Sequence, residues 1–271
     1  MGSHIAFIGG GNMASAIIQG LVGQGHPAEH LHVVEPFAEA RGRLAQQFGI
    51  TAQAQAGGFL EVAGLVVWAV KPQTFQEAAR QTQAHTRGAL HLSVAAGIPS
   101  QSIARWLGTE RIVRAMPNTP ALIGRGITAF FARAGVQVHD RQFVEQVIRS
   151  TGEYLLVDTE EQLDAVTALS GSGPAYVFYF MEAMMAAGSA MGLSAAQARQ
   201  LTLATFTGAS ELAWASEDPP EVLRQRVTSR GGTTHAAITA MDAAGLRPAF
   251  ERALHAARDR ARTLGEEFGG N

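Results

Sequence analysis

The chain of 271 residues contains no cysteine and only one lysine. Without cysteine it can form no disulfide framework, no thiolate metal site and no cysteine nucleophile. Lys71 is the single lysine and the other 20 of the 21 basic residues are arginines, so chemistry that needs a lysine amine has one candidate. Charged residues make up 16% of the chain and the net charge is −2. A dedicated nucleic-acid-binding protein needs clustered positive charge, so this composition argues against that function.

Hydrophobic residues make up 46% of the chain, which allows a large core and argues against intrinsic disorder. At about 150 residues per domain, the length suggests two domains. Residues 1–25 lack the basic segment of a signal peptide and carry glycines where its apolar core would lie. Residues 175–193 are long enough for a membrane span, but the central Glu182 would cost roughly 3 kcal/mol at the midplane. We therefore expect a buried core helix there and a soluble, cytoplasmic protein.

Short apolar runs alternate with helical patterns in the first 158 residues. Runs without polar alternation are typical of strands buried on both faces, as in a parallel sheet covered by helices. The predicted strands are residues 5–8, 31–34, 65–70, 90–94, 112–115, 127–131 and 154–157. Helical patterns between them include residues 13–22, 38–48 and 75–83. This alternation predicts a doubly wound α/β domain over residues 1–158.

Residues 159–271 show no strand pattern and are expected to form an all-helical domain. The spacing from Thr159 to Gln162, and again from Ser194 to Gln197, matches the capping box of a helix N-terminus. Helix breaks are expected at residues 171–174, 192, 218–220, 231–232 and 245. The last helix has one apolar face, formed by Leu246, Phe250, Ala253, Ala257, Ala261, Leu264 and Phe268.

The helix expected over residues 174–192 is apolar all round, which requires burial on every side. A domain of a few helices has too little surface to cover this helix on every side. A second copy of the domain would complete the burial, whereas a monomeric bundle packed against the sheet domain is the alternative. We favour the dimer.

The segment from Gly9 to Ala14 follows the first strand and opens a helix with the pattern G-x-G-x-x-A. Gly9 permits the tight turn, Gly11 lets the backbone approach a pyrophosphate, and Ala14 lets the helix pack close to the strand. The helix N-terminus presents N–H groups and the positive end of its dipole to phosphates. Because the pattern stands at the first strand–helix junction, it predicts dinucleotide binding rather than a structural glycine turn.

Glu35 ends the second predicted strand, where an acidic residue usually accepts the adenosine ribose hydroxyls. A carboxylate there would repel a 2′-phosphate, which favours NADH over NADPH. Arg41 and Arg43 follow on the next helix and would offset that repulsion if either reached the phosphate. A solvated carboxylate without a ligand is the alternative for Glu35.

Further strand ends are expected at the same edge, because the carboxyl ends of parallel strands line the ligand crevice of an open sheet. The third strand runs into Lys71, which is either a ligand contact or a solvated charge. Small residues at 93–97 would let the backbone approach the nicotinamide ribose. In the loop at residues 116–120, prolines restrict the backbone and Asn118 offers a neutral donor and acceptor.

Six motifs together resemble the pyrroline-5-carboxylate reductase family. They are the turn at residues 9–13 and residues 69–73, 93–97, 116–120, 169–176 and 227–234, in the family's order. The resemblance implies a Rossmann-type dinucleotide-binding domain followed by an all-helical dimerisation and substrate-binding domain over residues 159–271. It implies reduction of 1-pyrroline-5-carboxylate to L-proline with NADPH or NADH, the last step of proline biosynthesis. It also implies a homodimer that can assemble into a decamer.

The resemblance, with the turn chemistry above, assigns roles to two sets of residues. The cofactor-binding set is Gly9, Gly11, Asn12, Met13, Glu35, Ala69, Val70, Lys71, Pro72, Ala95, Ala96 and Gly97. The substrate-binding set is Asn118, Ser229, Gly231, Gly232, Thr233 and Thr234. Ser229 and the amides of residues 231–233 are implied to hold the substrate carboxylate, and Thr234 to hydrogen-bond the ring nitrogen as the catalytic residue.

The chain departs from the family pattern at two places. Arg230 stands where many members have proline or lysine, and residues 54–58 contain no asparagine, although some members hold the adenosine end with one there. The second departure leaves the cofactor preference open.

Reduction of an imine requires a weaker acid catalyst than reduction of a ketone. A ketone reductase must protonate an alkoxide and needs a tyrosine, lysine or histidine for it. A cyclic imine can arrive already protonated at nitrogen, so a hydroxyl such as that of Thr234 suffices. His235 is the rival acid, but as the next residue on a helix start it is expected to point elsewhere.

Two other functions are compatible with parts of the sequence. A β-hydroxyacid dehydrogenase shares the two-domain plan but needs a catalytic lysine on the first helix after the dinucleotide-binding domain, and no lysine follows Lys71. A dimer that only senses NAD(P)H is the non-enzymatic alternative, and the loop at residues 229–234 argues against it. No metal site is expected.

Overall fold

The computed structural model describes residues 3–270, which form two compact units. Within that range, unit 1 comprises residues 3–174 and 256–270, and unit 2 comprises residues 175–255. The domains expected at residues 1–158 and 159–271 begin and end outside the described residues, and their boundary stays a prediction. The compact units divide later in the chain than residue 158, because the helix that follows the last strand contacts β5 and β6 of the sheet.

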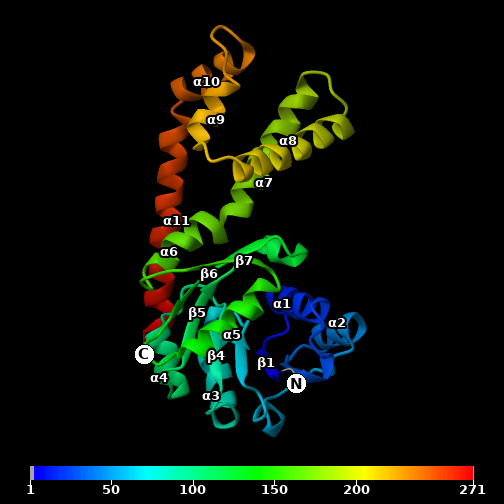
Figure 1. Cartoon of the computed structure of the whole chain (residues 1–271), viewed down its shortest axis with the longest axis vertical. Coiled ribbons are helices and arrows are strands. Elements are labelled where there is room, and N and C mark those ends of the chain that lie inside the picture. Colours follow the sequence, from blue (N-terminus) through cyan, green and yellow to red (C-terminus); the bar gives the residue numbers. More distant parts are fainter. Residues whose placement is uncertain (1–2, 271) are drawn as a thin grey trace. The chain divides into compact units, whose positions relative to one another are not determined.

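Unit 1 is built on a sheet of seven strands with the order β2-β1-β3-β4-β5-β6-β7 (Figure 1). The strands are β1 (Ile5–Ile8), β2 (Leu31–Val34), β3 (Leu65–Trp68), β4 (Leu90–Ser93), β5 (Ile112–Met116), β6 (Gly126–Ala132) and β7 (Gly152–Leu156). All seven lie where the apolar runs predicted them, with ends that shift by a residue or two. The prediction of an α/β fold is confirmed.

The parallel pairing predicted for the sheet holds from β2 through β5 and again between β6 and β7. It is wrong between β5 and β6, which pair antiparallel. A parallel connection needs a crossover of a dozen or more residues, whereas only the short helix η4 (Thr119–Ile123) lies between these strands. The chain therefore turns back on itself, and β6 runs against β5.

Helices cover both faces of the sheet (Figure 1). Successive side chains of a strand point to opposite faces, so Ile5 and Phe7 join one core cluster and Ala6 and Ile8 join the other. The first cluster includes α1 (Asn12–Gly23), α2 (Ala38–Phe48) and α5 (Val138–Arg149). The second includes α3 (Pro72–Thr82) and α4 (Ser100–Leu107). Three short helices, η1 (Ala28–His30), η2 (Gly58–Leu60) and η3 (Gln83–His85), lie in the connections.

The chain leaves the sheet through α6 (Gln162–Val166) and a π-helix, η5 (Thr167–Gly171). The capping box predicted from Thr159 to Gln162 is only half present. The Gln162 side chain accepts the backbone N–H groups of Asp158 and Thr159 at 2.8 and 3.0 Å. The helix begins at Gln162, after Glu161, so Thr159 is not its N-cap. The Gln162 side chain instead stabilises the turn that precedes the helix.

Unit 2 is helical. Its elements are most of α7 (Gly173–Ala190), α8 (Ala195–Ala215), α9 (Pro220–Arg226), α10 (Thr233–Ala243) and the first part of α11 (Leu246–Gly269), whose residues from 256 onward belong to unit 1. The capping box predicted at Ser194 and Gln197 is present. The predicted breaks at Gly192, Gly231 and Gly245 fall at positive φ between helices.

Helix α7 is the apolar helix that we expected to be buried on all sides. Within the single chain only Gly188 of this helix is buried, close to Ala198 of α8. Phe178 and Tyr179 are 57% and 71% exposed. None of the helices among residues 3–270 combines the length and the hydropathy that a membrane crossing requires.

Candidate functional site

The cofactor residues predicted from the sequence gather at one edge of unit 1. Strands β1, β3, β4 and β5 are parallel neighbours, so their carboxyl ends lie in a row. The chain leaves β1 for β2 on one side and continues to β3 on the other, which makes the space between β1 and β3 the topological switch point. Open α/β sheets bind their ligands at such a point.

The glycine turn between β1 and α1 has the backbone that the sequence predicts. Gly9 has a φ of +96°, and a Cβ on it would lie 2.6 Å from the carbonyl oxygen of Ala69. Only glycine fits there, because both the backbone conformation and the neighbouring β3 end exclude a side chain. The Gly9 N–H donates to the carbonyl of Val34 at 2.8 Å, so the turn is tied to β2 as well.

Gly11 stands at the N-cap of α1, and a Cβ on it would meet no protein atom within 4 Å. The protein therefore does not itself require glycine here, and the open space lies before the N–H groups of the first helical turn. No acidic residue occupies that turn. Asn12 and Met13 are its first residues, and Asn12 is exposed. An anion such as a pyrophosphate fits this geometry, because helix N-termini favour negative charge.

Glu35 ends β2 as predicted, but its carboxylate points into the protein. The side chain is 5% exposed. One oxygen accepts the N–H of Gly10 at 2.8 Å and the other accepts the N–H of Phe37 at 2.9 Å. The two bonds connect the phosphate-binding turn to the turn after β2, so Glu35 holds the shape of this edge. It is not the solvated carboxylate that we considered as the alternative.

The two arginines after β2 behave differently. Arg41 folds back over the turn, where its Nη1 donates to the carbonyl oxygens of Glu35 and Pro36 at 2.9 and 2.7 Å. Arg43 instead pairs with Glu39 one helical turn away, at 2.6 Å and largely exposed. A cation is therefore fixed beside the end of β2, and it is Arg41.

The other strand ends differ in how close they come to this turn. Ala69 contacts Gly9 directly, and Lys71 and Pro72 cap and begin α3. The amide of Ala95 donates to Ser93 Oγ at 3.3 Å, which stabilises the loop after β4. Gly97 has a φ of +79°, and a Cβ there would contact Leu264 of α11 at 3.1 Å. Packing against α11 is thus one reason for glycine at this position.

Asn118 follows β5 and is fixed by both ends of its amide. Its Oδ1 accepts the N–H of Ile127 at 3.0 Å, and its Nδ2 donates to Ser170 Oγ at 3.2 Å. The amide orientation is therefore determined by its neighbours. Ser170 lies in η5, within the motif at residues 169–176, whose residues had no predicted role.

The predicted substrate loop, residues 229–234, lies in unit 2 and leads into α10. Gly231 has a φ of +75°, and a Cβ on Gly232 would lie 2.6 Å from Ser229 Oγ. The N–H of Gly232 donates to the carbonyl of Ser229 at 3.0 Å, which closes the turn. Thr233 and Thr234 are in the first turn of α10, and no acidic residue is in that turn. His235 is exposed.

Comparisons with known proteins identify the family along the whole chain. The family model "Pyrroline-5-carboxylate reductase dimerisation" matches residues 160–264, and the model "NADP oxidoreductase coenzyme F420-dependent" matches residues 4–97. A pyrroline-5-carboxylate reductase from Pseudomonas aeruginosa is 44% identical over 268 residues, which cover 98% of each chain. The chain belongs to the pyrroline-5-carboxylate reductase family.

Solved structures of the family have the same fold. The reductase from Coxiella burnetii matches with a TM-score of 0.89 at 36% identity, over 97% of this chain and 99% of that one. The Plasmodium falciparum pyrroline carboxylate reductase, whose structure contains bound NADP, matches with a TM-score of 0.88 at 26% identity, over 97% and 98% of the two chains. The expected fold, a nicotinamide-dinucleotide oxidoreductase domain followed by a helical dimerisation domain, is confirmed.

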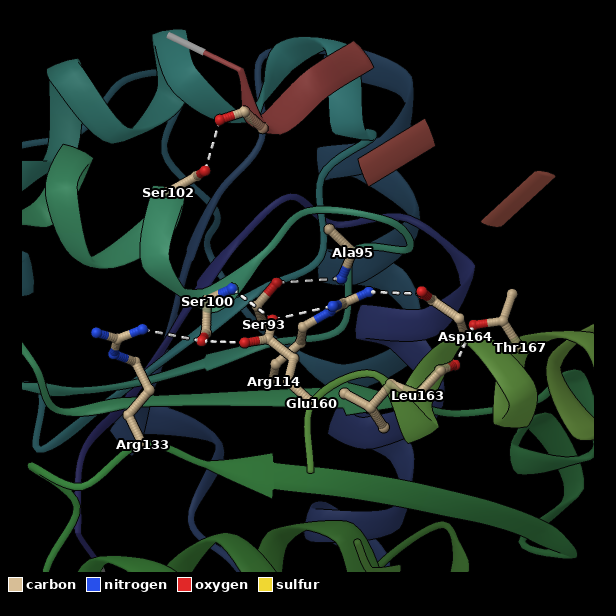
Figure 2. Close-up of polar contacts among 11 residues, drawn as sticks. Ser93, Ala95, Ser100, Ser102, Arg114, Arg133, Glu160, Leu163, Asp164 and Thr167 are labelled. Atoms are coloured by element: carbon tan, nitrogen blue, oxygen red, sulfur yellow. Dashed lines mark hydrogen bonds and ion pairs between the residues drawn. The ribbon is translucent and has the colours of Figure 1, made fainter. Parts of the chain in front are cut away.

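The sequence did not predict an ion-pair network in unit 1 formed by Arg114, Glu160 and Asp164 (Figure 2). Glu160 accepts the N–H of Ser100 at 2.6 Å and the Ser100 hydroxyl at 2.5 Å, and it pairs with Arg114 Nη1 at 2.9 Å. Arg114 also lies 3.8 Å from Asp164. Arginine is almost never buried without a partner, so the arginine within the apolar run at residues 112–115 was the signal for this network.

The pKa of Asp164 is shifted by its place in that network. Burial raises this pKa above its usual value, Arg114 opposes the rise, and the charge of Glu160 adds to it. A cavity of about 650 Å³ opens beside the network, between α4, α6 and the end of α11. Of the predicted cofactor-binding residues only Gly97 lines it, and the phosphate-binding turn does not, so this cavity does not coincide with the predicted dinucleotide site.

Proposed function

We propose that this chain reduces 1-pyrroline-5-carboxylate to L-proline with a nicotinamide dinucleotide, the last step of proline biosynthesis. The observation that carries this proposal is full-length membership of the pyrroline-5-carboxylate reductase family. The phosphate-binding turn supports it independently, because Gly9 and Gly11 have the conformation and the open space that a dinucleotide needs. The substrate, one reduced dinucleotide and one proton give proline and the oxidised dinucleotide.

Unit 1 holds the dinucleotide in this proposal. The first turn of α1 binds the pyrophosphate through the backbone N–H groups of residues 11–13, and the ends of β3 and β4 flank the rest of the molecule. Residues 69–72 and 95–97 keep the roles that the sequence predicted for them. The bound reduced dinucleotide supplies the hydride. The residues of the chain bind the substrate, orient its imine carbon and exclude water.

The loop at residues 229–234 is proposed to hold the substrate carboxylate. Ser229 and the amides of residues 231–233 stand at the N-terminus of the 11-residue helix α10, where an anion is favoured. The positive φ of Gly231 supports this arrangement, because it turns successive amides toward one side. Asn118 keeps the substrate-binding role predicted for it, and its Nδ2 has a second N–H group beside the one that Ser170 accepts.

Thr234 is proposed to hydrogen-bond the ring nitrogen. A protonated cyclic imine is electrophilic at carbon without further help, so the hydroxyl orients the nitrogen and relays its proton toward solvent. His235 is the alternative proton donor. It is exposed in the single chain, and consecutive helical residues point about 100° apart, so Thr234 and His235 do not share a direction.

Both NADPH and NADH are proposed as cofactors, and the lean toward NADH that Glu35 suggested stays a prediction. Its physical basis is weaker than the sequence implied. The Glu35 carboxylate is buried and accepts two N–H groups, which offset part of its charge. Arg41 lies at the same turn and would attract a 2′-phosphate. We therefore expect the preference to be small.

The active form is proposed to be a homodimer formed through unit 2. The match to the family's dimerisation model over residues 160–264 supports this assembly. The exposed apolar surface of α7 supports it as well, since Phe178 and Tyr179 are 57% and 71% exposed among residues 3–270. The decamer and the cytoplasmic location stay predictions.

The experiment that tests the proposed function compares two reactions of the purified chain. We expect rapid oxidation of NADPH or NADH with 1-pyrroline-5-carboxylate. We expect no reduction of NAD⁺ with a 3-hydroxyacid, because residues after 71 contain no lysine to act as its base. Binding of NADPH without turnover of either substrate would instead indicate the sensing dimer.

A further inference from the structure

One face of β5 and of the residues that follow it contacts the segment at residues 160–171 at several points. Arg114, Met116 and Asn118 are alternate residues, and side chains of a strand share a face at this spacing. Arg114 pairs with Glu160 and lies 3.8 Å from Asp164. Asn118 donates to Ser170 Oγ. The segment is thus held at its beginning by Arg114 and at its end by Asn118.

The middle of the segment is also packed against this face. A Cβ on Gly171 would overlap Cε of Met116, so the backbone of η5 lies directly on that side chain. Residues 167–171 form a π-helix. Such turns are rare in proteins overall, but many of those that occur are at functional sites. A shift of the segment along β5 would therefore separate Ser170 from Asn118 and press Gly171 against Met116.

The ion pair between Arg114 and Glu160 is buried enough to fix the register of the segment, that is, the position of residues 160–171 along β5. The Arg114 side chain is 8% exposed, and those of Glu160 and Asp164 are each 20% exposed. Glu160 also holds the first N–H and the hydroxyl of Ser100 at the start of α4 (Figure 2). Buried ion pairs add little net stability, but removing one partner strands the other charge. Their best supported use is to specify one arrangement among several.

We infer that Arg114 is a positioning residue for the substrate pocket, an inference that rests on the proposed function. By binding Glu160 and Asp164, Arg114 sets the register of the 160–171 segment so that Ser170 Oγ accepts from the amide of Asn118. Because Asn118 Oδ1 is occupied by the N–H of Ile127, this amide can offer only its Nδ2 to Ser170. The Ser170 hydroxyl proton is then free to be donated to the substrate.

The test is the effect of Arg114→Met on the KM values for the two substrates. Loss of the register weakens the substrate contacts of Asn118 and Ser170, which are worth about one or two hydrogen bonds. We expect the KM for 1-pyrroline-5-carboxylate to rise about 2- to 10-fold, with the KM for the dinucleotide unchanged. Ser170→Ala is expected to raise the KM for 1-pyrroline-5-carboxylate without lowering the melting temperature. This second variant tests the inference if Arg114→Met does not fold.

The matched control is Arg111→Met. Arg111 is also an arginine of unit 1 that binds a buried carboxylate, that of Asp140, at 2.7 Å. Although burial raises the pKa of Asp140, the hydrogen bonds from Arg111 and the Gln137 backbone outweigh it and lower that pKa. This pair closes the N-terminus of α5 and does not contact residues 160–171. Arg111→Met is expected to lower the melting temperature and to leave the substrate KM unchanged.

The double variant Arg114→Met/Glu160→Gln separates positioning from stability. It removes the charge left on Glu160, the nearer of the two carboxylates that Arg114 pairs with, so its melting temperature is expected to recover part of the way toward wild type while the substrate KM stays raised. A substrate KM that recovers with the melting temperature, or one that never rises in Arg114→Met and Ser170→Ala, overturns the inference alone. A wild-type chain that oxidises no dinucleotide with 1-pyrroline-5-carboxylate overturns the proposed function, and the inference with it.

Discussion

The carboxylate of Glu35 stabilises the phosphate-binding turn because each of its oxygens accepts a backbone N–H, one from Gly10 and one from Phe37. Its place at a strand end was predictable from the sequence, because the pattern of an acidic residue after the second strand is simple. Its hydrogen-bond partners were not, because they depend on how two turns approach each other. The same holds for Asn118, whose partner Ser170 is 52 residues away.

Thr234→Ala is expected to keep dinucleotide affinity and to lower kcat. The substitution removes the hydroxyl that is proposed to bind the imine nitrogen, and one positioned proton-transfer group contributes about 10²- to 10⁴-fold, with a relay near the low end. Steady-state kinetics with a fluorescence titration of NADPH measures both quantities. Thr233→Ala, the neighbouring threonine, is the control. Full activity of Thr234→Ala would remove this hydroxyl from the mechanism.

Arg41→Gln is expected to lower kcat/KM for NADPH and to leave that for NADH unchanged. The guanidinium beside the end of β2 would attract the 2′-phosphate, and a single screened charge contact is worth about tenfold in affinity. The control is Arg43→Gln, on the same helix, whose side chain pairs with Glu39. An equal loss with both dinucleotides would show that Arg41 only holds the turn.

At the scale of elements, a pair of buried side chains on β3 and β4 makes stability depend on pH. Trp68 Nε1 donates to His91 Nδ1 at 3.1 Å. Burial lowers the pKa of His91 from 6.5 to about 4. The unfolded chain therefore binds a proton below pH 6.5 that the folded chain does not, so this stability is present above pH 6.5 and is lost as the pH falls toward 4.

His91→Gln is expected to reduce that acid sensitivity while keeping an acceptor for Trp68. Between pH 7 and pH 5 the wild-type chain should lose about 2 kcal/mol more unfolding free energy than the variant, from the shift of the His91 pKa to about 4. Urea unfolding at one fixed protein concentration measures it. Equal losses in the two proteins would show that His91 does not titrate in this range.

The sequence predicted strand and helix positions well, because apolar runs and glycine breaks are local signals. It failed where the direction or the ending of an element depends on distant contacts. β6 runs antiparallel to β5 because the connection is short, and α6 begins at Gln162 because its side chain is used by the preceding turn. The π-helix η5 has no local signature, since its backbone packs on Met116 from another element.

At the scale of the whole molecule, the exposed face of α7 predicts association. Phe178 and Tyr179 are more than half exposed in the single chain, and large contiguous apolar patches on a protein mark interaction sites. Sedimentation velocity at micromolar concentration is expected to show a dimer or a multiple of it. Phe178→Asp is expected to dissociate it, whereas Phe37→Asp, an exposed phenylalanine in unit 1, is not. A compact wild-type monomer would contradict this assembly.

Transfer of the hydride from the dinucleotide to the imine carbon can be followed with an isotope label. The purified chain is incubated with 1-pyrroline-5-carboxylate and with NADPH that carries deuterium at the transferred position, and the product is analysed by chiral chromatography and mass spectrometry. The expected product is L-proline with one deuterium on the carbon next to nitrogen that was the imine carbon. Oxidised dinucleotide without labelled proline, or no oxidation at all, would contradict the proposed function.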